Sequence, residues 1–319
     1  MILFTTWAGS TYAWNSPQII GLGVACVLLL IAFVLVERKV AEPIIPPRLF
    51  RNVVFNIGTA VGLVIGLAMF GAIFFLPPFL QLVDEASPTN SGLRMVPLMI
   101  GLLASSIISG LLISRTGRYK IFPVLGTGLA TFGMYLLSTL TPTTSVFALS
   151  LYMVIVGIGM GMVMQILVMA IQNAIDHKDM GVATSSATFF RSIGSCLGLA
   201  IFGSIFSNQL TSNLRAHLPA SAHINPAALQ GSPAALANLP AAVHGPVVQA
   251  FADSLHVVFL TAFPFLLVAF VLTWFLKEVP LRKHAGGLAA EGIELGEATG
   301  EIVVTAGEED LAPEPSPVA

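Results

Sequence analysis

Of the 319 residues, 55% are hydrophobic and only 9% are charged, and the mean hydropathy is +0.88. Because an ordinary soluble domain carries about 25% charged residues, this composition excludes a water-soluble globular protein and requires a lipid bilayer as the solvent. The net charge of −2 hides an asymmetry, since eight acidic residues and no Lys or Arg follow Lys283. The sequence therefore predicts a basic membrane part followed by an acidic tail.

Seven apolar runs approach the length of about 20 residues that a helix needs to cross the hydrocarbon core. They predict an all-α, polytopic membrane protein with transmembrane helices at residues 18–36, 53–76, 92–113, 121–140, 145–172, 183–206 and 256–276. Two consecutive prolines, Pro77 and Pro78, lack backbone donors and are expected to kink the second helix before residues 79–83 continue it.

These helices divide the chain into three regions. Residues 1–52 hold an external segment, an extra transmembrane helix and a basic cytoplasmic linker. Residues 53–276 form a six-helix domain, in which residues 207–255 are expected to be an external loop because they are polar and interrupted by prolines. Residues 277–319 are expected to be a disordered, acidic tail in the cytoplasm.

The short loop at residues 114–120 sets the orientation of the helices, because cytoplasmic loops of membrane proteins carry the excess of Lys and Arg. With its three basic residues inside, alternation places eleven Lys and Arg residues in the cytoplasm and two, Arg94 and Arg215, outside. The sequence therefore predicts a multi-pass protein of the plasma (cell inner) membrane, with its N-terminus outside and its C-terminus cytoplasmic.

Small residues recur at every fourth position on three of the expected helices. Such stripes let helix backbones approach closely in lipid. Structural packing is the simpler interpretation, and a rocking or sliding surface between helix bundles is the functional one. The stripes consist of Gly58, Gly62, Gly66, Gly157, Gly161, Gly194 and Gly198.

One basic residue, Arg191, falls inside an expected helix, about two turns from its cytoplasmic end. Its charge could snorkel to the headgroups, clamp helix carbonyls or a loop acid such as Asp176 or Asp179, or act as a cation in a substrate cavity. We favour a clamp near the cytoplasmic gate, because a charge left at depth without a partner is costly.

Other polar residues inside the expected helices are few. Gln165 lies among several methionines, which suit an adaptable binding wall as well as a packed core. No Asp or Glu falls inside the seven helices as placed above. The chain by itself then lacks the membrane carboxylate on which a proton-coupled carrier usually relies.

Motifs for other kinds of chemistry are missing from the sequence. It contains no phosphate-binding Gly-Lys-Ser/Thr loop, its histidines in residues 207–255 lack metal-ligand spacing, and nothing suggests a catalytic triad. The two cysteines, Cys26 and Cys196, lie in apolar runs and suit a packing role. We therefore expect no enzyme, no cofactor, no metal site and no nucleic-acid partner.

The loop between the third and fourth helices carries a family resemblance. Its sequence is similar to the loop motif of the major facilitator superfamily, Gly-x-x-x-Asp-Arg-x-Gly-Arg-x-x, at Gly110, Arg115, Gly117, Arg118 and Lys120. Residues 7–14, 43–52 and 183–194 resemble, more specifically, the fourteen-helix drug:proton antiporters of the EmrB/QacA type. The resemblance covers residues 1 to about 280.

This resemblance implies export of a small amphipathic drug-like compound, with a cation as one option, in exchange for protons by alternating access. In the family, the first helix of each three-helix repeat tends to line the cavity, which puts residues 53–82 and 145–172 on the substrate path. Candidate substrate contacts are then Gln81, Met164 and Gln165. The residues expected to act in gating are Gly110, Arg115, Gly117, Arg118, Lys120 and Arg191.

The sequence departs from the family pattern in two ways. Ser114 stands where the motif has Asp, so the loop lacks the acid that helps to lock the two halves. The family has fourteen helices where seven are expected here, so the chain corresponds to a C-terminal half, inactive unless an N-terminal half is supplied in cis or in trans. The alternative is a non-transporting membrane scaffold or remnant that pairs with other helices. Seven further apolar spans encoded in frame upstream of Met1 would favour the transporter.

Overall fold

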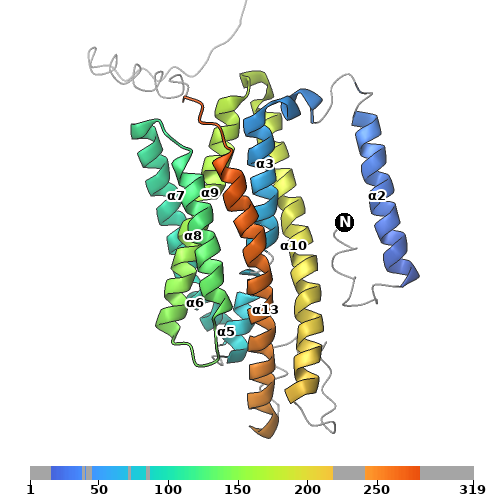
Figure 1. The fold of residues 1–319 in the computed structure, drawn as a ribbon, viewed down its shortest axis with the longest axis vertical. Coiled ribbons are helices and arrows are strands. Elements are labelled where there is room, and N and C mark those ends of the chain that lie inside the picture. The colour runs from blue at the N-terminus through green and yellow to red at the C-terminus, as the bar shows by residue number, and fades with distance from the viewer. Residues whose placement is uncertain are drawn as a thin grey trace, which may run out of the picture. The chain divides into compact units, whose positions relative to one another are not determined.

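The computed structural model describes residues 16–37, 40, 45–70, 73–83, 87–217 and 241–280, and the described residues form helices without any strand (Figure 1). The longer helices are α2 (Pro17–Glu37), α3 (Val53–Ile65), α7 (Val96–Thr116), α8 (Ile121–Ser138), α9 (Val146–Ala174), α10 (Met180–His217) and α13 (Ala241–Trp274). The shorter ones are η1 (Pro47–Arg51), the π-helical turn η2 (Gly66–Phe70), α5 (Leu76–Val83), α6 (Pro88–Arg94) and η3 (His177–Asp179).

Within the described residues, six helical segments are long and apolar enough to cross a membrane. They are Val53–Phe70, Thr89–Thr116, Ile121–Ser138, Val146–Ala174, His177–Ala216 and Gly245–Trp274. These segments confirm the all-α, polytopic prediction. The extra helix expected at residues 18–36 corresponds to α2, which is apolar over Pro17–Leu29. The external segment at residues 1–15 and the acidic tail from residue 281 onward lie outside the described residues.

The break in the second expected helix comes earlier than its prolines. Helix α3 passes into the π-helical turn η2 at Gly66, and a new helix, α5, begins at Leu76. Pro77 and Pro78 therefore lie in the first turn of α5, where backbone N–H groups need no partner within the helix. The prolines start a new helix here instead of bending a continuous one.

The loop expected at residues 207–255 is much shorter than its composition suggested. Helix α10 continues to His217 and α13 already begins at Ala241, which leaves residues 218–240 outside the described part. The extension is stable because Leu210 and Leu214 on α10 are buried. Phe206 also packs against Phe251 of α13, with ring centroids 4.9 Å apart.

The longer α13 corrects a second expectation. Asp253 lies within the candidate span Gly245–Trp274, whereas the expected helix began only at residue 256. Its carboxylate accepts a hydrogen bond of 2.8 Å from Nε2 of Gln249, one turn earlier. One acidic residue therefore does lie inside this candidate span.

The helices pack in a consistent order around a shared apolar core. Helices α7 and α8 both pack on α9, while α10 packs on α3 and on η2 (Figure 1). Helix α13 joins the two groups, because it contacts α8, α10 and α3. Large rings such as Phe202, Phe251 and Phe259 are fully buried where these helices meet.

Glycines bring several of these backbones into direct contact. A Cβ atom added at Gly194 or Gly198 of α10 would fall on the carbonyl oxygen of Leu63 or Leu67, respectively. Between α7 and α9, a Cβ atom at Gly157 or Gly161 would likewise fall on a carbonyl oxygen of α7. At these positions no larger residue fits unless a backbone moves.

Candidate functional site

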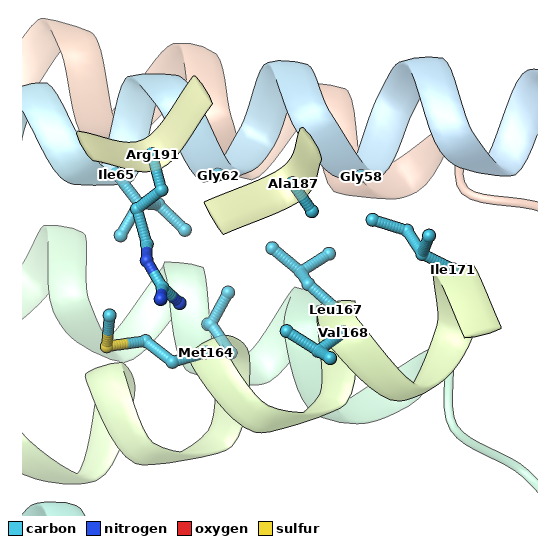
Figure 2. A pocket seen from close by; sticks show the side chains of 10 residues that line it. Gly58, Gly62, Ile65, Met164, Leu167, Val168, Ile171, Ala187 and Arg191 are labelled. Atoms are coloured by element: carbon cyan, nitrogen blue, oxygen red, sulfur yellow. The ribbon is translucent and has the colours of Figure 1, made fainter. Parts of the chain in front are cut away.

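A pocket opens where α3, α9 and α10 meet (Figure 2). Its lining comes from Gly58, Gly62 and Ile65 on α3, from Met164, Leu167 and Val168 among the residues of α9, and from Ala187 and Arg191 on α10. All of these except Arg191 are apolar or glycine. The pocket is therefore an apolar crevice with one cationic side chain.

Small residues create the space in this crevice. A Cβ atom added at Gly62 would have nothing within 4 Å, although the residue is buried. At Gly58 an added Cβ atom would meet only the flexible side chain of Ile171, at 2.9 Å. The cavity volume is about 20 Å³, which suits about one water molecule, whereas pockets for drug-sized ligands are about 300–1,000 Å³. By itself the crevice is therefore much smaller than a site for a drug-sized ligand.

The backbone of α10 is held firmly at Arg191. A Cβ atom added at Gly66 would fall on the Arg191 carbonyl oxygen, and the same oxygen accepts a hydrogen bond of 3.0 Å from Oγ of Ser195. The Arg191 side chain is half-buried and crosses the pocket toward Met164 of α9 (Figure 2). Within the described part of the chain, its guanidinium makes no ion pair or hydrogen bond.

Asp179, one of the two loop acids expected as possible partners of Arg191, belongs to a different pair. Oδ1 of Asp179 accepts a 2.6 Å hydrogen bond from Nη2 of Arg48, in the linker helix η1. The Asp179 side chain is 9% exposed and that of Arg48 is 58% exposed. Arg191 lies eleven residues beyond Met180, about 16 Å along α10, which is beyond the reach of its side chain to Asp179. A clamp at the α9–α10 corner does exist, but Arg48 supplies it.

Further hydrogen bonds connect the helices at the end of the bundle that carries Tyr119 and Asp179. This end is called the Tyr119 end. Asn52 caps α3 by accepting from the backbone N–H of Val54 at 2.9 Å, and its Nδ2 donates to the carbonyl of Ala174 at 2.7 Å. The start of α3 is thereby bound to the end of α9.

Tyr119 fixes the α7–α8 loop to the segment that follows α13. Its hydroxyl donates to the carbonyl of Lys277 at 2.9 Å and accepts from the backbone N–H of Val279 at 3.0 Å. Nδ2 of Asn173, at the end of α9, donates to the carbonyl of Val279 at 3.1 Å. Burial raises the pKa of the Tyr119 phenol above its ordinary 10.0, and the nearby Glu278 charge acts in the same direction.

The expected site residues separate into two groups. Met164 and Arg191 meet in the pocket together with Gly58 and Gly62. Gln165 is exposed and is not part of the pocket lining. Gln81, on α5, is also outside the lining, and its Nε2 donates to Oγ of Ser91 at 3.2 Å.

The loop residues expected to act in gating stand mostly at the surface. Arg115 and Arg118 are exposed and Lys120 is half-buried. Gly117 has a φ of 69° and ends α7, as glycine commonly does at a helix C-terminus. A Cβ atom at Gly110 would have nothing within 4 Å. The buried residue of this loop is Tyr119, which the sequence analysis did not single out.

Comparisons with known proteins agree with this architecture. A family model described as "Major Facilitator Superfamily" matches residues 1–199. An uncharacterized MFS-type transporter of Mycobacterium tuberculosis is 45% identical over 281 residues, which cover 88% of this chain and 41% of the relative. The multidrug transporter protein MdtP of Bacillus subtilis is 37% identical over 88% of this chain and 56% of its own length.

A shorter relative and a solved structure extend the comparison. The tetracycline resistance determinant of Streptomyces rimosus is 30% identical over 87% of this chain and 88% of its own length. A bacterial homolog of the human lysosomal transporter Spinster, solved in an inward-facing and unoccupied conformation, has a TM-score of 0.58 at 20% identity. It covers 72% of this chain and 49% of its own, and it shows the fold alone. The chain spans 41% of the length of the M. tuberculosis relative.

Proposed function

Because the chain belongs to the Major Facilitator Superfamily, we propose that it forms part of an exporter of small amphipathic, drug-like compounds. Transport would proceed by proton antiport and alternating access about a site near the midplane. Relatives named for multidrug transport and tetracycline resistance support the substrate class. The transporter superfamily to which the chain belongs is not an enzyme class.

The observation that carries the proposal is the pocket between α3, α9 and α10. Apolar side chains and glycines line it, and Met164 gives it an adaptable wall. Amphipathic compounds need this combination of an apolar surface and a single polar anchor. Because α3 and α10 both line the pocket, a movement of one helix relative to the other would change the shape of the pocket.

A complete transport site would need a second set of helices opposite this wall. The cavity of about 20 Å³ cannot hold a drug-sized molecule by itself. We propose that an N-terminal half, in cis or in trans, supplies the opposing wall. This chain matches 41% of the length of the M. tuberculosis relative, so the N-terminal half of that relative is a suitable partner for a test.

An efflux assay tests both parts of this proposal. In cells that lack their own drug exporters, the chain expressed with the relative's N-terminal half should lower tetracycline accumulation, and a protonophore should abolish the effect. The chain expressed alone should leave accumulation at the level of the empty vector. Efflux by the chain alone would contradict the need for a second half. No efflux by the pair, with both parts present in the membrane, would favour a scaffold.

Proton coupling can be examined at a specific carboxylate. Asp253 lies within the span Gly245–Trp274 and is partly buried, and intramembrane acids commonly carry protons in transporters. Asp253→Asn should abolish the response of efflux to an imposed pH gradient, whereas Asp176→Asn, at an exposed corner, should leave it intact. A normal response in Asp253→Asn would assign proton transfer to the other half.

We also propose that the Tyr119 end faces the cytoplasm of a cell whose plasma (inner) membrane holds the protein. This orientation puts the N-terminus outside and follows from the excess of Lys and Arg in the loops. Ser114, in the last turn of α7, and Thr143, in the turn that follows α8, are exposed and are connected through the whole length of α8. In a background of Cys26→Ser and Cys196→Ser, an impermeant thiol reagent should label Thr143→Cys in intact cells but Ser114→Cys only after lysis. Labelling of Ser114→Cys in intact cells would reverse the topology.

A further inference from the structure

We propose that Arg191 makes the pocket selective for amphipaths that carry an anionic oxygen, above all a carboxylate, over neutral amphipaths of the same shape. This inference rests on the proposed function and specifies the substrate class of the same pocket. It replaces the helix clamp that the sequence suggested for Arg191 with a direct role in ligand recognition.

The first argument is the charge balance of the pocket. Among the described residues that line it, Arg191 alone is ionisable, and the others are apolar or glycine. Of the two loop acids at the α9–α10 corner, Asp179 already pairs with Arg48 and Asp176 is exposed to solvent. A guanidinium in a low-dielectric crevice without a counter-charge favours an anionic ligand.

The second argument is the geometry of the side chain. The α10 backbone is fixed at Arg191 by its contact with Gly66 and by the Ser195 hydrogen bond, while the side chain extends across the pocket toward Met164 (Figure 2). A guanidinium presents a planar fork that binds a carboxylate through two parallel hydrogen bonds. The apolar body of such a ligand would lie on Met164 and Leu167, over the open space at Gly62.

An anionic lipid headgroup offers the same oxygen chemistry, and position argues against it as the main occupant. Arg191 lies within the span His177–Ala216, eleven residues beyond Met180 and about 16 Å along the helix. An arginine side chain can move its charge back toward the interface by only part of that distance. The test therefore separates a soluble carboxylate from a lipid phosphate.

The experiment measures the binding of two matched probes to the full chain co-purified with the relative's N-terminal half, in nanodiscs of phosphatidylcholine alone. Naproxen carries a carboxylate and its methyl ester is neutral, and empty discs correct for partition into lipid. Arg191→Gln should weaken naproxen binding by about tenfold or more and leave the ester unchanged. Arg191→Lys should fall between, because it keeps the charge and loses the fork.

Two further variants locate the effect. Ser192→Ala, on the exposed side of α10 next to Arg191, should bind both probes as the wild type does. Gly62→Leu, which fills the open space, should weaken both probes. Helicity and a single peak in size exclusion establish that each variant is folded. If Arg191→Gln does not fold, the inference is tested by whether Arg191→Lys weakens naproxen binding and leaves ester binding unchanged.

Several outcomes would overturn the inference. The first is equal binding of naproxen by the wild type and Arg191→Gln. The second is a loss of ester binding, as well as naproxen binding, in Arg191→Gln. The third is a loss of naproxen binding when the discs contain phosphatidylglycerol. The last result would assign the site to lipid headgroups, and retained binding in those discs supports the proposal. Tetracycline efflux combined with equal binding of naproxen and its ester would overturn the inference and leave the proposed function standing. Selective binding without efflux by the two-part transporter would remove the transport role alone.

Discussion

Helix α3 meets α10 in two different ways along its length. Beyond the end of α3, Gly66 of η2 and Gly194 and Gly198 of α10 press against backbone atoms of the opposite helix, and no Cβ atom fits. Toward the start of α3, Gly58 and Gly62 face a crevice that Ala187 and Arg191 of α10 also line. The same four-residue glycine spacing thus serves close packing in one region and open volume in the other.

The difference between the two regions has a physical consequence. In lipid, helix association depends on van der Waals packing and close backbone approach, so the tight region holds α3 and α10 together. The change from α-helix to π-helix at Gly66 coincides with the start of this tight region, and π-helical turns often occur at functional sites. The open region is then the part that can admit a ligand without separating the helices.

The largest effect is expected in the tight region, from Gly194→Ala. The added methyl group would fall on the Leu63 carbonyl oxygen, and two packed backbones must separate to admit it. We expect a loss of about 3 kcal/mol in the free energy of unfolding, measured by titration with SDS and loss of helicity in detergent. Gly203→Ala, on the same helix but with nothing within 4 Å, is the matched control. Equal stability of the two variants would contradict the tight contact.

A smaller loss is expected at the Tyr119 end from Arg48→Ala. This change leaves the buried Asp179 carboxylate without its ion-pair partner. Because Arg48 is 58% exposed and solvent screens the pair, we expect a cost of about 1–2 kcal/mol in the same titration. Arg51→Ala, an exposed neighbour in η1, should change little. Asp179→Asn should restore part of the loss in the Arg48→Ala background, because it removes the unpaired charge.

Tyr119→Phe should cost about 1 kcal/mol, since it removes a hydroxyl that donates to Lys277 and accepts from Val279. The wild type should also lose stability at high pH. Folding raises the pKa of the Tyr119 phenol above 10.0, so its contribution is complete below pH 10 and disappears as the pH rises through the folded pKa. Tyr119→Phe should lack this component. An identical decline above pH 10 in both proteins would show that Tyr119 does not cause it.

Features that depend on the local sequence could be predicted, whereas features that depend on contacts between distant residues could not. Apolar runs of about 20 residues located the helices because each run reflects only its own contact with lipid. The extension of α10 was missed because residues 207–217 are polar on average, although Leu210 and Leu214 mark a buried stripe at helical spacing. A periodicity count in place of mean polarity would have detected it.

The candidate site was less predictable because it depends on contacts between residues that are far apart in the sequence. The sequence indicates Arg191 and Met164 as separate candidates, but their position beside Gly62 depends on how three distant helices pack. The Arg48–Asp179 pair joins residues that are 131 positions apart, so no local pattern could indicate it. Tyr119 stood in the motif loop, and its burial follows only from the return of residues 276–280 to that loop.

The smallest effect, and the sharpest test of the two-region comparison, is expected from Gly62→Ala. Gly62 lies in a regular part of α3, and an added methyl group would meet nothing within 4 Å. Alanine is favoured over glycine in a helix interior by about 1 kcal/mol, so the variant should be unchanged or slightly more stable in the SDS titration. Gly66→Ala, one turn later, should be clearly destabilised because its methyl group falls on the Arg191 carbonyl oxygen. If Gly62→Ala loses as much stability as Gly66→Ala, the crevice is closed in the membrane, and α3 and α10 are packed tightly along their whole contact.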